Sequence, residues 1–424
     1  MINKVKALIS RVNKSKDGKV LASNFGYLML LQIAGYVFPL ITIPYLARVI
    51  GVEGFGKIAF AAAVVVWFQT VSDWGFNYTA TRDIARNRDN PEKVSEIFSN
   101  VLWARILLML LSFVILMVAV NTIPYFKENQ TILLVTFLLV PGHILFPEWF
   151  FQAMERMKFI TLFSLISKAI FTILVFVFIK EKSDFILQPL FISLGYILSG
   201  IFSIYLIVVK WKVKIFKPHW QSIYKTIKNS SNVFITNITP NLYNSLAIVL
   251  LGFWGGSVAN GIYDAGRKFI TLAHSFMAII IRVVFPFLSR SLDKHKLFTK
   301  IYLLLSVIGT VVLFFISPII IKLFFTKEFY DAETVLKILS FSIFFVSLNR
   351  VYGTNYLIIK GFEKELRNIT FACSILGFII SIPLVYYYSY IGAALTLVAT
   401  QAILGFTTMF KALSVERKDK LLHS

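Results

Sequence analysis

The chain has 424 residues, of which 57% are hydrophobic and 15% are charged, whereas a soluble domain has about 45–50% apolar and about 25% charged residues. With 42 phenylalanines and a mean hydropathy of +0.75, it holds more apolar side chains than soluble cores of this length can bury. The composition therefore excludes an ordinary soluble enzyme and indicates a membrane protein. A formal net charge of +22 is typical of nucleic-acid binding in a soluble protein, so the positions of the cations decide its meaning.

Twelve mainly apolar stretches divide the chain, each near the roughly 20 residues that a transmembrane helix needs. They predict an all-α polytopic membrane protein with twelve transmembrane helices. The predicted spans are 22–46, 54–78, 101–121, 131–151, 161–179, 185–209, 231–252, 259–287, 301–325, 332–359, 369–389 and 391–413. Because no cleavage site of small residues follows the basic residues 1–20, we expect the first span to remain uncleaved.

The cations are distributed unevenly between the two sides that this topology defines. Connections on the side of the N-terminus hold 29 Lys and Arg, and connections on the opposite side hold six. Cytoplasmic loops carry such an excess, so we expect both termini in the cytoplasm and no nucleic-acid partner. The connections are too short for a soluble catalytic domain, and the single Cys373 excludes a disulfide framework.

An offset of 205 residues aligns Gly51 and Gly56 with Gly256 and Gly261, each pair between two predicted spans. The spans that precede these glycines are also expected to be interrupted by proline, at Pro39, Pro44 and Pro240. This weak repeat predicts two six-helix lobes, and transporters with such halves bind substrate between them. The expected lobes are residues 1–209 and 231–424, and residues 210–230 form the basic linker between them.

Motifs with known chemistry find little support. The segment 51–58, G-V-E-G-F-G-K-I, nearly matches a P-loop, but Ile58 lacks the hydroxyl that binds Mg²⁺, so a tight glycine turn is the better interpretation. No H-E-x-x-H, C-x-x-C or G-x-S-x-G motif occurs, and the five histidines are scattered. The sequence therefore predicts no catalytic residue, no metal site and no cofactor, and we do not expect an enzyme.

Eight cations lie inside the predicted spans, where a charge costs from ~3 to above 10 kcal/mol unless it faces a cavity or a partner. Three- and four-residue steps predict one polar stripe on the eighth span. Its members are Asp264, Arg267, Lys268, Thr271, His274, Ser275 and Arg282. The stripe favours a cavity; alternatively Asp264 pairs with Lys268 and Arg282 snorkels to the membrane surface, which leaves Arg267 unexplained.

Polar residues recur on three further spans. Asn237, Asn241 and Asn244 share one face beside Pro240, and they either line the same cavity or form interhelical hydrogen bonds. Lys168 lies on another stripe, from Thr161 to Thr172, and Arg350 lies on a third, from Lys337 to Thr354. We expect Arg105 and Lys322, nearer to helix ends, to snorkel. The cations of the spans outnumber Asp73, Glu148, Asp264 and Glu333, so the interior favours an anionic solute such as phosphate or pyrophosphate.

Three stretches resemble the Wzx-type O-antigen flippases. Residues 51–102, from G-V-E-G-F-G-K-I-A-F-A to E-I-F-S-N-V-L, are similar to that family's second span and the loop after it. Residues 147–161, P-E-W-F-F-Q-A-M-E-R-M-K-F-I-T, are similar to its fourth-span exit, and 261–269, G-I-Y-D-A-G-R-K-F, to the start of its eighth span. The sequence departs from the family at Ala153 and Gly266, where glycine and alanine are expected.

The resemblance implies a MATE-like fold in the multidrug/oligosaccharidyl-lipid/polysaccharide exporter superfamily, in the bacterial inner membrane. It implies an undecaprenyl-pyrophosphate-linked oligosaccharide as substrate, with an O-antigen polymerase and a chain-length regulator as candidate partners. In the family's Y-x-A-x-[KR] segment the cation falls on Arg267. Together with the stripes this predicts a cationic substrate site; its residues are Arg267, Lys268, Lys168, Arg350 and Arg282. Asp264 and Glu148 are expected to be counter-ions or coupling residues.

Two other functions are alternatives to a flippase. A MATE-like cation-coupled drug or solute antiporter needs an acidic lobe, but no carboxylate lies between Asp17 and Glu53 in the first span. An O-antigen polymerase or lipid-linked glycosyltransferase needs a long extracytoplasmic loop, and the outer connections are too short. The sequence thus favours the flippase and keeps the antiporter as the alternative.

Overall fold

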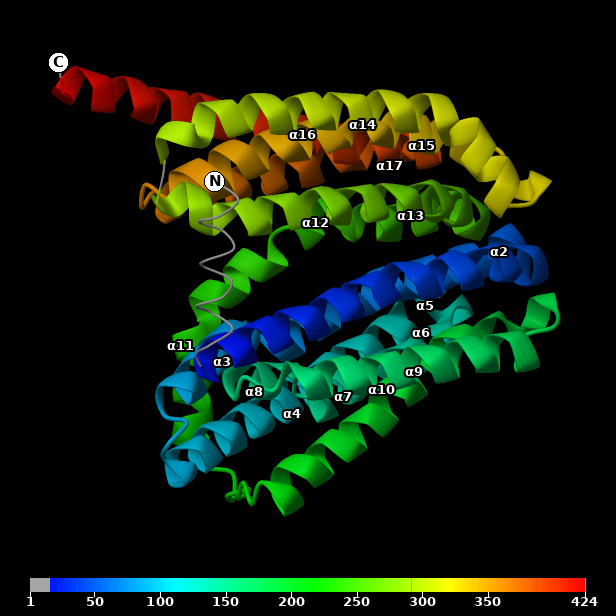
Figure 1. The fold of residues 1–424 in the computed structure, drawn as a ribbon. Coiled ribbons are helices and arrows are strands. Elements are labelled where there is room, and N and C mark those ends of the chain that lie inside the picture. Colours follow the sequence, from blue (N-terminus) through cyan, green and yellow to red (C-terminus); the bar gives the residue numbers. More distant parts are fainter. Residues whose placement is uncertain (1–15, 291, 424) are drawn as a thin grey trace. The chain divides into compact units, whose positions relative to one another are not determined.

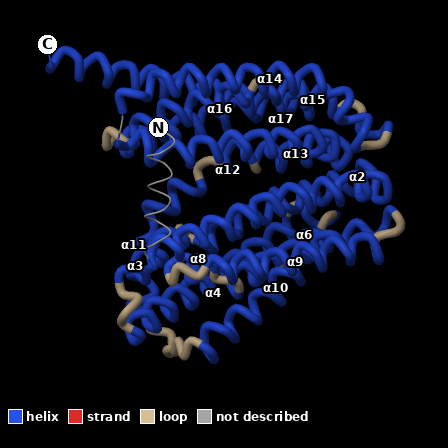
Figure 2. The backbone as a smooth tube through the Cα atoms, viewed as in Figure 1, coloured by secondary structure: helices blue, strands red, loops and turns tan. Residues whose placement is uncertain are grey.

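The computed structural model describes residues 16–290 and 292–423, and every element in that part is a helix (Figures 1 and 2). The chain forms two compact units. The first unit holds the described residues up to Tyr45 together with Phe68–Ile235, and the second holds Leu46–Trp67 with the described residues from Thr236 onward. The predicted all-α fold class is therefore confirmed, and the loop between the first two spans belongs to the second unit.

The first unit contains the helices from the first part of α2 to most of α11. They are α2 up to Tyr45 (α2 as a whole is Lys16–Asp73), α3 (Phe76–Arg86), α4 (Pro91–Thr122), α5 (Pro124–Glu128), α6 (Gln130–Phe137), α7 (Leu139–Leu145), α8 (Glu148–Ala153), α9 (Met157–Phe178), η1 (Lys182–Ile186), α10 (Leu187–Tyr205), the π-helix η2 (Leu206–Lys210) and most of α11 (Trp220–Ile238).

The second unit contains two very long helices. Beside part of α2 it holds α12 (Asn241–Asn244), α13 (Leu246–Arg290), η3 (Leu292–Lys294), α14 (His295–Phe324), η4 (Lys327–Phe329), α15 (Ala332–Ser340), α16 (Ser342–Leu348), the π-helix η5 (Asn349–Ile358) and α17 (Glu363–His423).

Nine helical segments among the described residues are long and apolar enough to cross a membrane. Three of them, at 61, 66 and 56 residues, are more than twice as long as one crossing requires. Each of these three contains a residue with non-helical backbone, namely Gly51, Gly256 or Ser389. If each long segment crosses twice, the structure is consistent with the twelve predicted spans.

Proline shapes the predicted spans in different ways. The helix stops at Ile238 and resumes at Asn241 with Pro240 between, so the expected interruption of the seventh span is confirmed. By contrast, α2 continues through Pro39 and Pro44, and the expected interruption of the first span is wrong. A proline removes one backbone hydrogen bond, which packing against neighbouring helices can offset in a long helix.

The two aligned glycine pairs form a reciprocal contact within the second unit. Gly51 (φ 64°, ψ −178°) and Gly256 (φ 73°, ψ −172°) have the same backbone conformation, which favours glycine because φ is positive. A Cβ on Gly56 would lie 1.7 Å from the Ser257 carbonyl oxygen, and a Cβ on Gly261 would lie 2.1 Å from the Val52 carbonyl oxygen. Each turn thus packs on the glycine of the other.

A buried aromatic run fixes the start of α8 in the first unit. Trp149, Phe150 and Phe151 are almost completely buried and pack with Phe98 of α4. Aromatic side chains of this size contribute much of the packing energy of a core. The run therefore fixes the position of Glu148, the first residue of α8.

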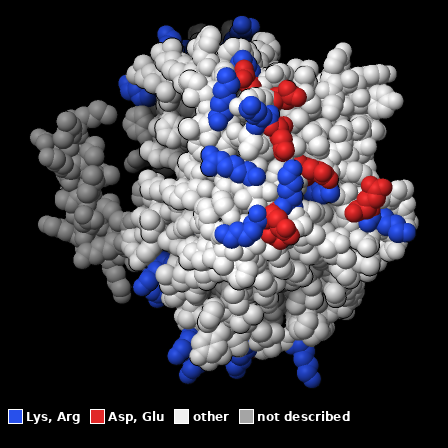
Figure 3. All heavy atoms as spheres, turned by 90° about the vertical axis from the view of Figure 1, so that its right-hand side faces the viewer, with Lys and Arg blue, Asp and Glu red and all other residues white. Residues whose placement is uncertain are grey.

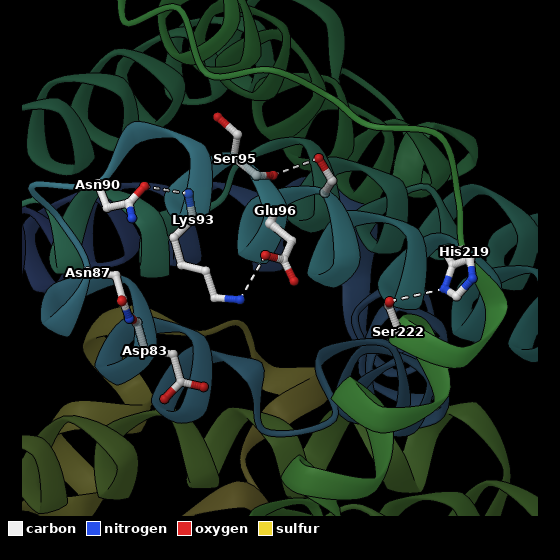
Figure 4. A network of polar contacts seen from close by, with 9 residues as sticks. Asp83, Asn87, Asn90, Lys93, Ser95, Glu96, His219 and Ser222 are labelled. Atoms are coloured by element: carbon white, nitrogen blue, oxygen red, sulfur yellow. Dashed lines mark hydrogen bonds and ion pairs between the residues drawn. The ribbon is translucent and has the colours of Figure 1, made fainter.

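The N-terminus of α4 carries a side-chain cap. The Asn90 Oδ1 atom accepts a hydrogen bond of 3.0 Å from the Lys93 backbone N–H, as Figure 4 shows. Replacing Asn90 by alanine is expected to lower the free energy of unfolding by about 1 kcal/mol. Thermal melting of the purified protein measures the effect, and Asn368→Ala, which changes an exposed asparagine inside α17, is the control. Equal melting temperatures for the two variants would contradict the capping role.

Candidate functional site

Asp73 and Arg105 form a buried ion pair in the first unit. The Arg105 Nη2 atom lies 3.3 Å from the Asp73 Oδ1 atom, and the two side chains are 6% and 19% exposed. The expectation that Arg105 snorkels to the membrane surface is therefore wrong. Its partner lies on a helix 32 residues earlier in the chain, which the spacing of charges along a single span cannot reveal.

Glu148, Lys168 and His143 surround this pair. Glu148 interacts electrostatically with both Arg105 and Lys168, and the His143 ring stacks on Tyr196 with centroids 4.3 Å apart. The Lys168 ammonium lies close to α2, 3.6 Å from the position of a Cβ on Gly35. The first unit thus contains a group of two carboxylates and two cations, of which the sequence identified Glu148 and Lys168 as site residues.

In the second unit, the start of the predicted stripe on α13 is an ion pair. Lys268 Nζ lies 2.7 Å from Asp264 Oδ2 and 5.3 Å from the centre of the Phe55 ring. The alternative interpretation, in which these two residues pair along the helix, is thus correct for them. Arg267 has no carboxylate within ion-pair distance among the described residues. It is a half-buried cation whose charge is not neutralised by a neighbouring acid.

Arg350 connects the tenth predicted span to α13. Its Nη1 atom donates a hydrogen bond of 2.7 Å to the His274 carbonyl oxygen, and the His274 ring lies 3.0 Å from Ser342 Oγ. Arg350 belongs to the π-helix η5. Such helices are rare in proteins overall, but those that occur often lie at functional sites. The stripe predicted for a regular α-helix from Lys337 to Thr354 is interrupted there.

The remaining predicted residues of the second unit lie nearer to the surface. Thr271 and Arg282 are exposed, whereas Asn237, Asn241 and Asn244 are half-buried. Because the helix breaks at Pro240, the three asparagines do not share one continuous helix. Lys168 and Glu148 belong to the first unit, and all the other predicted site residues belong to the second.

The arrangement suits binding of an anion better than covalent chemistry. Within residues 16–290 and 292–423, no three His, Cys, Asp or Glu side chains come close enough to hold a metal ion. A guanidinium group binds phosphate with two parallel hydrogen bonds, a geometry that a lysine ammonium does not provide. Three residues that take part in these contacts were not predicted as site residues: Asp73 and Arg105 in the first unit and Ser342 in the second.

A family model and two named relatives place the chain in the same family. Residues 21–292, more than half of the chain, match the family model "Polysaccharide biosynthesis protein". A protein of Escherichia coli (strain K12) named "Putative O-antigen transporter" is 28% identical over 95% of this chain and 98% of its own. A protein of the same name from Shigella dysenteriae is 26% identical over 90% of this chain and 97% of its own.

Solved structures show the same fold at low sequence identity. The lipid II flippase MurJ in an inward closed conformation has a TM-score of 0.70 and 17% identity, over 90% of this chain and 87% of that one. A multidrug resistance MATE family transporter in an inward-facing conformation has a TM-score of 0.66 and 14% identity, over 92% and 99%. The predicted MATE-like fold and the resemblance to Wzx-type flippases are confirmed. The chain is a multi-pass membrane protein that belongs to the polysaccharide biosynthesis protein family of membrane transporters.

Proposed function

We propose that this protein is a flippase for undecaprenyl-pyrophosphate-linked repeat units of an O-antigen or a related surface polysaccharide. It moves them from the cytoplasmic to the periplasmic leaflet of the bacterial inner membrane by alternating access, and both termini are cytoplasmic. The family, the named relatives and the uneven distribution of Lys and Arg support this proposal. A glycan that crosses through water while its polyprenyl chain stays in lipid avoids the cost of burying polar groups in hydrocarbon.

Arg267 is the main contact for the pyrophosphate. The observation that carries this assignment is that Arg267 has no carboxylate partner in the described part of the chain, whereas its neighbour Lys268 is paired with Asp264. Three further cations of the second unit contact the same anion, one cation of the first unit also binds the substrate, and polar side chains contact the glycan. The cations are Lys268, Lys168, Arg350 and Arg282, and the polar residues are Asn237, Asn241, Asn244, Thr271 and His274.

Two carboxylates balance these cations. Asp264 holds Lys268, and Glu148 interacts with Arg105 and Lys168. We assign both as counter-ions that are able to carry a coupling proton or cation. An O-antigen polymerase and a chain-length regulator are the partners that receive the product.

Arg267→Ala is expected to lower the rate of repeat-unit export about tenfold or more, because each lost hydrogen bond to a charged group costs about 1.5–3 kcal/mol. Arg267→Lys should keep part of the activity, since it keeps the charge. The measurement is lipopolysaccharide gel analysis in a strain from which the native gene is deleted. Lys322→Ala, which removes an exposed cation, is the control, and full surface glycan with Arg267→Ala contradicts the anion role.

The flippase itself is tested by the deletion alone. Loss of the surface glycan together with accumulation of lipid-linked repeat units in the cytoplasmic leaflet is the expected result. Normal surface glycan and no accumulated intermediate, in a strain without a second flippase, would exclude this function and favour the antiporter.

A further inference from the structure

The segment between η2 and α11 follows a fixed path on the surface of α4. The Lys214 backbone N–H donates to Ser95 Oγ at 3.1 Å, and the Phe216 backbone N–H donates to Ser99 Oγ at 2.9 Å. The Trp103 indole N–H then donates to the Phe216 carbonyl oxygen at 2.9 Å. The three α4 residues are spaced by four and lie on one helix face. This segment therefore presents its side chains from a defined position.

Helix α11 continues this surface, with one face held by the first unit. Ser230 Oγ lies 2.7 Å from Thr79 Oγ1. The Trp74 indole stacks on the Phe234 ring with centroids 3.8 Å apart and planes within 5° of each other. At the start of α11, the His219 Nδ1 atom lies 3.2 Å from Ser222 Oγ (Figure 4). The face of α11 opposite these contacts is open.

Large apolar side chains are exposed between residues 215 and 224, at the end of the connecting segment and the start of α11. Ile215, Phe216, Trp220 and Tyr224 are 42%, 39%, 66% and 58% exposed. Trp and Tyr are enriched where a membrane meets water, because one end of each side chain is apolar and the other polar.

Six lysines surround these aromatic residues without any acid to neutralise them. No Asp or Glu occurs from residue 185 to residue 263. All six lysines are exposed, and the described residues provide none of them with a carboxylate partner; they are Lys210, Lys212, Lys214, Lys217, Lys225 and Lys228. The face of the molecule in Figure 3 differs, because carboxylates lie among its cations. Other lysines of the chain are paired; Lys57, for example, is 2.8 Å from Glu53.

We propose that this surface, residues 210–228, binds the anionic headgroups of membrane phospholipids. Lysines that alternate with aromatic residues at a membrane surface attract anionic lipid, and the aromatic rings then insert at the level of the headgroups. Because the segment is held by α4 and by Trp74, bound lipid also fixes the first unit against the leaflet. The proposal does not depend on which substrate the protein carries.

Trp220 provides the test. The purified full chain is placed in nanodiscs of phosphatidylcholine with a minority of phosphatidylglycerol, and bromine, a fluorescence quencher, is attached to one lipid or the other at equal mole fraction. The difference between the wild type and Trp220→Phe isolates the fluorescence of Trp220. We expect brominated phosphatidylglycerol to quench Trp220 roughly threefold more strongly than brominated phosphatidylcholine, and salt to reduce this preference.

The variant Lys212→Gln/Lys214→Gln/Lys217→Gln/Lys225→Gln should lose the preference for phosphatidylglycerol. The control Lys294→Gln/Lys296→Gln/Lys300→Gln/Lys364→Gln removes the same number of charges from other connections and should keep it. Equal quenching by both lipids in the wild type, or an unchanged preference in the first variant, overturns the proposal. Because these nanodiscs contain no lipid-linked oligosaccharide, failure here is distinct from failure of the proposed transport function.

Discussion

Replacing Gly56 by alanine is expected to lower the free energy of unfolding by about 3 kcal/mol or more. The added Cβ would lie 1.7 Å from the Ser257 carbonyl oxygen and 2.7 Å from the Gly261 backbone nitrogen. Both are backbone atoms, so no side-chain rotation relieves the overlap. Gly261→Ala should have a similar effect, since its Cβ would lie 2.1 Å from the Val52 carbonyl oxygen.

The melting temperature of each purified variant and its amount in the membrane measure this effect. Gly26→Ala is the matched control, because it lies on the same helix and its Cβ meets nothing within 4 Å. This control should be neutral or slightly stabilising, as alanine favours helix more than glycine does. A Gly56→Ala protein that melts at the same temperature as the Gly26→Ala protein would show that the two turns do not pack closely.

Arg105→Met is expected to be almost as damaging, with a loss of about 3–5 kcal/mol. The substitution leaves the Asp73 carboxylate buried without the guanidinium that lies 3.3 Å away. The double variant Arg105→Met/Asp73→Asn should recover much of the loss, because it removes the uncompensated charge. A double-mutant cycle on the unfolding transition measures the coupling between the two side chains.

An exposed ion pair provides the comparison for Arg105. Arg82 and Asp83 are 2.8 Å apart, but their side chains are 54% and 44% exposed. Arg82→Met should therefore change the free energy of unfolding by no more than about 1 kcal/mol. Similar losses for Arg105→Met and Arg82→Met would mean that burial does not strengthen the Asp73–Arg105 interaction.

The spacing of residues along the chain was sufficient to predict the helices and one contact on α13. Asp264 and Lys268 are four residues apart, so a regular helix places them together, and the pair is present at 2.7 Å. Proline alone was not sufficient to predict a helix break, because the helix stops beside Pro240 but continues through Pro39 and Pro44. The stripe from Lys337 to Thr354 does not keep a regular helical period, because the π-helix η5 changes the number of residues per turn from Asn349 onward.

The sequence by itself determined the class of molecule. Apolar stretches of sufficient length must cross the bilayer as helices, and the uneven cations favour one orientation, since both effects depend only on local composition. The tertiary structure decided which charges are neutralised. Arg105 finds a partner 32 residues away, whereas Arg267 has none among the described residues, because an ion pair between helices depends on packing that composition does not encode.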